Sequence, residues 1–147
     1  MNTLPPRLQE IVEEFALCSG QEKLEHLLDF AENLPPLPDW LKSRREELEQ
    51  VHECMTPVFV YAHMENGRLS YYFDVPENSP TVRGFAAFLA KGTEDVTPEA
   101  LLGIPGDFYL ATGLAQVLTM QRMNGLNAIL AQMKRLAVDR LSKDPVI

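Results

Sequence analysis

The chain has little cysteine and no long apolar run. Its only two cysteines, Cys18 and Cys54, form neither the closely spaced pair of a zinc site nor a disulfide framework, so we expect free thiols in a reducing compartment. No stretch approaches the roughly 20 apolar residues that a membrane-spanning helix needs. The first residues lack the features of a secretion or transit signal. The sequence therefore predicts a soluble, cytoplasmic protein with no membrane partner.

Basic residues are also scarce. Lys and Arg number 13 against 21 Asp and Glu, and the formal net charge is −8. Proteins bind nucleic acid largely by neutralising phosphates with Lys and Arg, so this charge argues against a nucleic-acid partner. Glycine-rich phosphate loops of the Walker and GxGxxG types are missing as well. We predict no cofactor and no bound metal.

The hydrophobic patterns predict one domain, residues 1–147, of the α+β class. The chain is long enough to bury a core and too short for two comfortable domains. Apolar residues three and four positions apart indicate amphipathic helices. Ser19 with Glu22 fits a capping box, and Asp39, Thr97 and Thr119 fit N-caps. The predicted helices cover residues 8–18, 20–34, 39–51, 81–92, 98–102 and 120–141. The expected buried face of the last helix consists of Leu126, Ile129, Leu130, Met133, Leu136 and Ala137.

Between residues 58 and 75 the pattern becomes that of strands. The residues are β-branched and aromatic, and Asn66-Gly67 divides them into 58–65 and 68–75. A two-residue type I′ turn needs positive φ at both central positions, which Asn-Gly tolerates best. We therefore expect an antiparallel hairpin within a small sheet, with helices packed on one face.

Cys54 is the main candidate for chemistry. It lies in VHECMTPVF, residues 51–59, where we expect a loop between helix and strand, whereas Cys18 continues the apolar stripe of the first helix and is interpreted as core. The thiolate is the nucleophile, and a free thiol with a pKa of about 8.5 is only slightly ionised at neutral pH unless a cation lies near. Glu53 opposes ionisation. The cations that the fold could bring near Cys54 are His52, Arg44, Arg45, Arg83 and Arg122.

Other functions use the same residues. Cys54 with His52 suggests a Cys/His hydrolase, although the sequence context typical of papain-like or caspase-like nucleophiles is missing. His52, Cys54 and His63 could be imagined as zinc ligands, but their spacing is poor evidence for zinc. A non-catalytic interaction domain is the remaining alternative.

Several segments together resemble the SufE-type cysteine desulfuration proteins, the sulfur acceptors of iron–sulfur cluster assembly. VHECMTPVF is similar to the family pattern V-x-G-C-x-S-x-V-W, and the last helix opens with a segment similar to L-[ST]-x-x-R-x-N-G-L-x-A-M. Their order and spacing make the combination specific. The segments are LPPLP, VHECMTPVF, TVRGFAAFLAKG and LTMQRMNGLNAIL.

The resemblance implies a function and a fold. Family members bind and stimulate a pyridoxal-phosphate-dependent cysteine desulfurase, accept its persulfide sulfur on a loop cysteine without independent turnover, and pass it to an iron–sulfur scaffold complex. Their fold is α+β with a three-stranded antiparallel sheet, shared with U-type scaffold proteins. In this sequence the acceptor corresponds to Cys54, and Arg83, Arg122 and Asn124 correspond to family motif positions with a structural or supporting role.

One departure from the family lies beside the cysteine. Glu53 stands where the family usually has glycine, and glycine lets a loop adopt positive φ and lets another backbone approach closely. We therefore expect Glu53 to distinguish this chain from its relatives in how the loop enters a partner.

Overall fold

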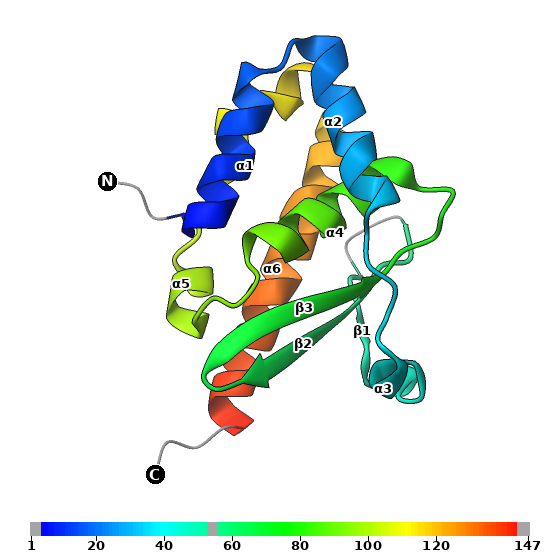
Figure 1. Cartoon of the computed structure of the whole chain (residues 1–147), viewed down its shortest axis with the longest axis vertical. Coiled ribbons are helices and arrows are strands. Elements are labelled where there is room, and N and C mark those ends of the chain that lie inside the picture. The colour runs from blue at the N-terminus through cyan, green and yellow to red at the C-terminus, as the bar shows by residue number, and fades with distance from the viewer. Residues whose placement is uncertain (1–3, 53–55, 144–147) are drawn as a thin grey trace.

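An antiparallel three-stranded sheet with layered helices forms the protein (Figure 1). The computed structural model describes residues 4–52 and 56–143. The strands, in the order β1-β2-β3, are β1 Glu49–Gln50, β2 Phe59–Glu65 and β3 Arg68–Asp74. The α-helices are α1 Pro6–Leu17, α2 Gly20–Glu32, α3 Asp39–Lys42, α4 Pro80–Gly92, α5 Pro98–Leu102 and α6 Met120–Lys143, and the 3-10 helices are η1 Arg45–Glu47, η2 Phe108–Thr112 and η3 Leu114–Gln116.

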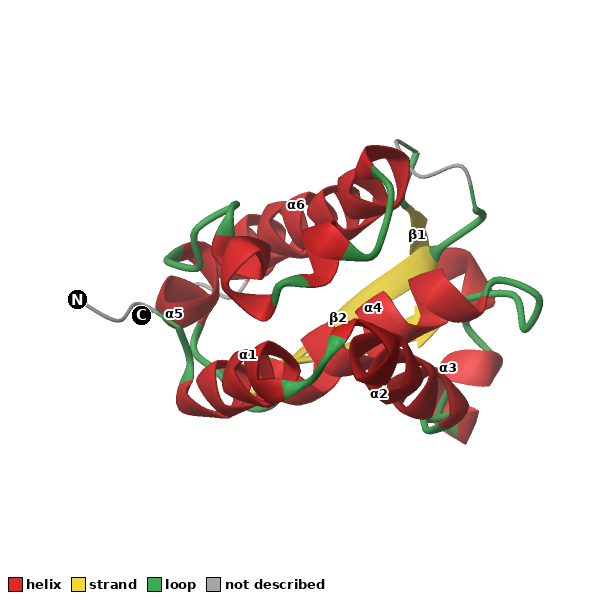
Figure 2. Cartoon of the chain, turned by 90° about the horizontal axis from the view of Figure 1, so that it is seen from above, coloured by secondary structure: helices red, strands yellow, loops and turns green. Residues whose placement is uncertain are grey.

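The helices form two layers over one face of the sheet. Helices α4 and α6 contact β3 and β2, and α1 and α2 pack against α4 on the side away from the sheet (Figures 1 and 2). On the opposite face, a small cluster of Leu37, Leu41 and Leu48 packs against β2 and β3. The predicted α+β fold is confirmed, and the short α3 covers part of the second face in addition.

The predicted hairpin is confirmed in strands, turn and register. Glu65 pairs with Arg68 and the register runs to Phe59 opposite Asp74. Asn66 and Gly67 have φ of 55° and 77°, the left-handed region that the type I′ turn requires at both positions.

The helix predicted over residues 39–51 is wrong. Only Asp39–Lys42 is α-helical, a 3-10 turn follows, and Glu49–Gln50 forms β1, with Glu49 opposite Val60. Leu48 packs in the outer cluster, whereas Val51 lies in the main core on the other side of the sheet. An extended chain sends residues of opposite parity to opposite faces, so strand geometry satisfies both side chains, and the tertiary structure overrides the helical pattern.

The caps predicted at Ser19, Thr97 and Thr119 are confirmed, whereas the cap predicted at Asp39 is wrong, because Pro38 is the N-cap of α3 and Asp39 is its first helical residue. Ser19 and Glu22 form a capping box at α2. In this box the Ser19 backbone N–H donates to the Glu22 carboxylate at 2.8 Å, and this hydrogen bond holds the pKa of the Glu22 carboxyl below its usual value. Thr97 Oγ1 accepts from the Ala100 N–H at 3.2 Å, and Thr119 Oγ1 accepts from the Arg122 N–H at 3.3 Å.

The prediction that Cys18 lies in the core is wrong. It is the C-cap residue of α1, its side chain is only partly buried, and its thiol donates to the Glu14 carbonyl at 3.3 Å. The helix ends there because Lys23, a buried lysine of α2, donates its ammonium to the carbonyls of Phe15 and Cys18. The Phe15 carbonyl also accepts from the Cys18 N–H at 3.1 Å, so Lys23 adds a second donor there and caps the Cys18 carbonyl at the end of the helix.

The long helix α6 supplies much of the core. Its buried face was predicted correctly, and the helix runs two residues beyond the predicted end, to Lys143. None of the described helices is both long enough and apolar enough to cross a bilayer. The predicted buried residues of α6 that lie in the core are Leu126, Ile129, Leu130, Met133, Leu136 and Ala137.

Helix α4 lies in the centre of the helical layers because two glycines let its neighbours approach. A Cβ atom at Gly84 would lie 2.6 Å from the backbone oxygen of Leu27 in α2. At Gly92 it would lie 2.7 Å from Cδ1 and 3.0 Å from Cα of Leu8 in α1. Close backbone approach therefore fixes both outer helices on α4.

We predict that Gly84→Ala destabilises the fold by about 1–3 kcal/mol, because the added methyl group must displace the Leu27 backbone. The midpoint of chemical denaturation measures the change. Gly106→Ala is the matched control, since a Cβ atom there meets no heavy atom within 4 Å. Equal midpoints for the two variants would show that the α2–α4 contact does not require glycine.

Candidate functional site

The predicted acceptor lies on the connection between β1 and β2. Glu53 and Cys54 themselves lie outside the described residues. At the base of the connection the Val51 N–H donates to the Val58 carbonyl at 2.8 Å, and both valines are fully buried. The base of this connection is therefore held in the core, and the connection joins two strands instead of a helix and a strand.

One side of this loop lies near the start of α4. Thr56 Oγ1 is 3.5 Å from Ser79 Oγ, in the residue immediately before the helix. The Arg83 guanidinium in the first turn of α4 donates to the Val75 carbonyl at 2.6 Å. This bond joins α4 to the chain leaving β3 and gives Arg83 a structural role.

His52, the first residue of the loop, is exposed and lies against α6. It lines a hollow between β1 and α6, where Arg135 donates from Nε to Gln132 Oε1 at 2.9 Å. Arg135 is a cation beside His52 that was not among the cations predicted near Cys54. Its signal is helical spacing, because residues 132, 135, 136 and 139 recur on one side of α6. The residues lining the hollow are Glu49, Gln50, His52, Gln132, Arg135, Leu136 and Asp139.

Two other predicted cations are engaged in ion pairs. Arg44 pairs with Glu47, with the second nitrogen at 3.1 Å from the carboxylate. The pairing raises the pKa of the Arg44 guanidinium and lowers that of the Glu47 carboxyl. Arg45 pairs with Asp74 at the end of β3. The first ion pair joins the two ends of the 3-10 turn η1, and the second joins this turn to strand β3.

Arg122 and Asn124 lie in the first turns of α6, and both are exposed. Within the described part of the chain, neither side chain forms a hydrogen bond or an ion pair. Nor does such a bond join His52, Arg83, Arg122 and Asn124 to one another over residues 4–52 and 56–143. The structure therefore leaves Arg122 and Asn124 available to a partner, whereas Arg83 is occupied.

His63, the third residue imagined for zinc, lies on β2 with its ring 5.1 Å from that of Trp40. It belongs to an aromatic group on the outer face of the sheet with Tyr61 and Tyr72. Among the described residues, no group of three or more His, Cys, Asp and Glu side chains is arranged to hold a metal ion.

A family model and the sequences of several known proteins match most of this chain. The family model of SufE, the Fe-S metabolism associated domain, matches residues 9–137. An uncharacterized SufE-like protein of Mycobacterium tuberculosis is 40% identical over 134 residues, which cover 90% of this chain and 92% of that protein. The Sulfur acceptor protein CsdE of Escherichia coli is 30% identical over 115 residues, covering 77% of this chain and 75% of that one.

A solved structure is also similar to this chain in fold and sequence. The solution structure of a hypothetical protein from Thermus thermophilus superposes with a TM-score of 0.83 at 38% identity, covering 95% of this chain and 98% of that one. The family match, the relatives and the shared fold extend over nearly all of the sequence. The chain therefore belongs to the SufE family.

Proposed function

We propose that this protein is a sulfur acceptor, which takes sulfur from a pyridoxal-phosphate-dependent cysteine desulfurase onto Cys54, stimulates that enzyme, and delivers the sulfur to an iron–sulfur scaffold complex. The observation that carries the proposal is the family match over residues 9–137. The resemblance of VHECMTPVF to the family pattern supports Cys54 as the acceptor. The E. coli relative named as a sulfur acceptor supports it.

The transfer is a thiol–persulfide exchange. The Cys54 thiolate attacks the terminal sulfur of the donor persulfide, the sulfur–sulfur bond of the donor breaks, and the donor cysteine leaves as thiolate. Cys54 then carries the persulfide, so the step needs neither an external oxidant nor a cofactor on the acceptor. A second exchange of the same kind passes the sulfur onward.

The surroundings of the loop suit this exchange. The buried pairing of Val51 with Val58 holds the base of the connection that carries Cys54. Arg135 lines the same hollow as His52 and supplies positive charge beside the first described residue of the connection. Positive charge favours a thiolate over a thiol, and it also favours a persulfide anion.

We predict that incubation with a cysteine desulfurase, its pyridoxal phosphate and cysteine adds one sulfur, about 32 Da, to the intact protein, because the exchange leaves one persulfide per acceptor thiol. Cys54→Ser should abolish the added mass, and Cys18→Ser should retain it. Intact-protein mass spectrometry under non-reducing conditions measures both. An unchanged adduct in Cys54→Ser, or none with any desulfurase tested, would overturn the proposal.

Substitution of His52 distinguishes a sulfur acceptor from a Cys/His hydrolase. A hydrolase needs its histidine as general base, so His52→Ala would remove nearly all of its activity. A sulfur acceptor needs only the thiolate and access to the donor, and we predict that His52→Ala retains most of the transferred sulfur. The measurement is the initial rate of persulfide formation on Cys54. Loss of nearly all transfer would favour a dyad.

Arg122 and Arg83 should behave differently. Removal of the exposed Arg122 side chain in Arg122→Ala should leave the denaturation midpoint unchanged and slow transfer several-fold, because an exposed cation at a family motif position is lost. Arg83→Ala should lower stability by about 1 kcal/mol, since the Val75 carbonyl loses its donor. Denaturation curves and transfer rates of both variants provide the measurement. A fall in stability without a change in transfer for Arg122→Ala would contradict this assignment.

A further inference from the structure

The free edge of β3 is closed at both ends and open in the middle. At one end Leu69 donates its N–H to Val96 and accepts from the Asp95 N–H, at 2.7 and 2.9 Å. Beyond the other end the Val75 carbonyl accepts from Arg83. Backbone groups alternate along a strand, so Tyr71 and Phe73 also direct their N–H and C=O groups away from β2.

Tyr71 and Phe73 leave these outward groups unpaired. No hydrogen bond between described residues uses the outward N–H or C=O of either residue. An edge strand with unpaired donors and acceptors is a template for another strand, which proteins usually block with charge, proline or a covering element. In β3 the outward backbone groups of Leu69, and the Val75 carbonyl just beyond the strand, are hydrogen-bonded to other elements. The outward groups of the residues between them are not covered in this way by any described residue.

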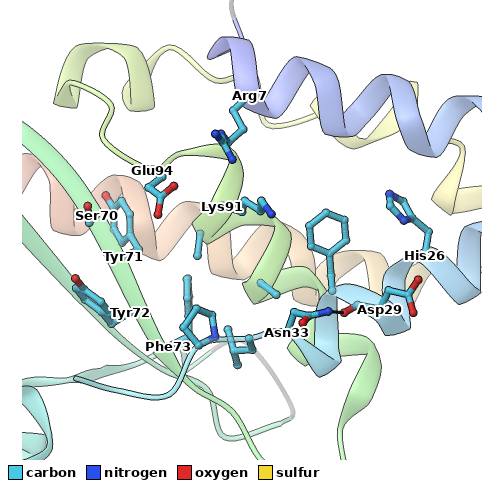
Figure 3. Close-up of a pocket in the computed structure, with 15 residues that line it drawn as sticks. Arg7, His26, Asp29, Asn33, Ser70, Tyr71, Tyr72, Phe73, Lys91 and Glu94 are labelled. Atoms are coloured by element: carbon cyan, nitrogen blue, oxygen red, sulfur yellow. Dashed lines mark hydrogen bonds between the residues drawn. The ribbon is translucent and has the colours of Figure 1, made fainter. Parts of the chain in front are cut away.

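The open part of the edge faces a groove of about 620 Å³. Four consecutive residues of β3, 70–73, line it, although their side chains alternate between the two faces of the sheet. A sheet face would contribute every second residue, so the wall of the groove is the strand edge itself. Helix α2 and the residues after it form the opposite wall, with His26, Phe30 and Leu34 (Figure 3). Ala87 and Ala90 of α4 supply small side chains between the walls.

Two cations project over this groove. Arg7 of α1 and Lys91 of α4 line it, and Figure 3 shows both directed into the space between β3 and α2. Neither side chain forms an ion pair or hydrogen bond with another residue of the described ranges. Asp29 and Glu94 are also among the lining residues. The charge pattern suits a single carboxylate between the two cations and disfavours a run of acidic residues.

We propose that this groove binds an extended segment of a partner protein, which adds to β3 as a fourth strand and places one acidic side chain at Arg7 and Lys91. Main-chain hydrogen bonds to Tyr71 and Phe73 hold the segment, and its alternate side chains contact the small residues of α4, which is the β-augmentation mode of peptide recognition. A second copy of this chain fits less well, because the helices beside its own β3 would meet α1 and α2.

The proposal does not depend on the sulfur-acceptor role. The loop with Cys54 joins β1 to β2, whereas the groove follows the outer edge of β3, at the other side of the strand order. Failure of sulfur transfer and failure of segment binding are therefore separate results.

Amide hydrogen exchange of the free protein gives the first test. The N–H groups of Ser70 and Tyr72 face their partners in β2, so these two amides should exchange at least about tenfold more slowly than those of Tyr71 and Phe73. Equal protection of all four amides would show that the edge is already paired, and it would overturn the proposal.

Selection from a random-peptide display library gives the second test. Peptides that bind the full chain should contain an acidic residue, and they should slow exchange at the Tyr71 and Phe73 amides. Lys91→Glu should weaken their binding by about tenfold through lost attraction and added repulsion. Lys42→Glu, the same charge change at an exposed residue of α3, should leave binding unchanged.

A neutral variant separates the groove from general electrostatics. Ala90→Phe should weaken binding of the same peptides by at least about tenfold, because the larger side chain occupies space between the walls. Peptides that bind Lys91→Glu and Ala90→Phe as tightly as the original chain would overturn the proposal. So would a library without binders, or a concentration-dependent dimer that protects the same two amides without peptide.

Discussion

The close approach of α4 to α2 and α1 is the contact on which the other parts of the structure depend. Gly84 brings the α4 backbone against the Leu27 carbonyl, and Gly92 does the same against Leu8. Since α4 lies directly on the sheet, this contact sets the distance of both outer helices from the strands. The residues that follow α2 cross to the outer face, where Leu37 and Leu41 pack, before the chain enters β1. Two features of the segment TVRGFAAFLAKG therefore have a structural explanation. Its glycines allow the close packing of the helices, and its Arg83 donates a hydrogen bond to the chain beyond β3.

The loop that carries the candidate acceptor gains its position from the same arrangement. Strand β1 has only two residues, and an isolated pair of such strands is weak. The buried Val51 and Val58, with the hydrogen bond between them, supply the stability that the short strand lacks. The chemistry required of a sulfur acceptor is an accessible thiolate at a fixed place on the surface. A base held by buried residues meets part of this requirement, since it fixes the two described ends of the connection.

The sequence predicted the features that local interactions determine. Asn66-Gly67, the box of Ser19 with Glu22, and the cap at Thr119 each act within a few residues, and each is present in the structure. Residues 39–51 were predicted incorrectly because their charged residues fit a helix, while Leu48 and Val51 are drawn to opposite faces of a sheet that exists only in the folded chain. Arg135 was missed for the same reason, since its proximity to His52 depends on how α6 crosses β1. Cys54 was selected from its loop position and the resemblance to the SufE family, and neither depends on these tertiary contacts.

The two surfaces on opposite sides of the strand order suggest why a small carrier would keep part of a sheet edge open. A loop cysteine that must meet a donor thiol offers little contact area of its own, and brief exchange requires that the contact also break. A second, independent attachment at β3 would raise the effective concentration of donor and acceptor without strengthening the contact at the cysteine. The sheet suits this purpose because β2 is shared: it pairs with β1 at the base of the loop and with β3 beside the groove. Segment binding at one edge and sulfur exchange near the other would then be joined by one rigid element, and each could change through evolution with little effect on the other.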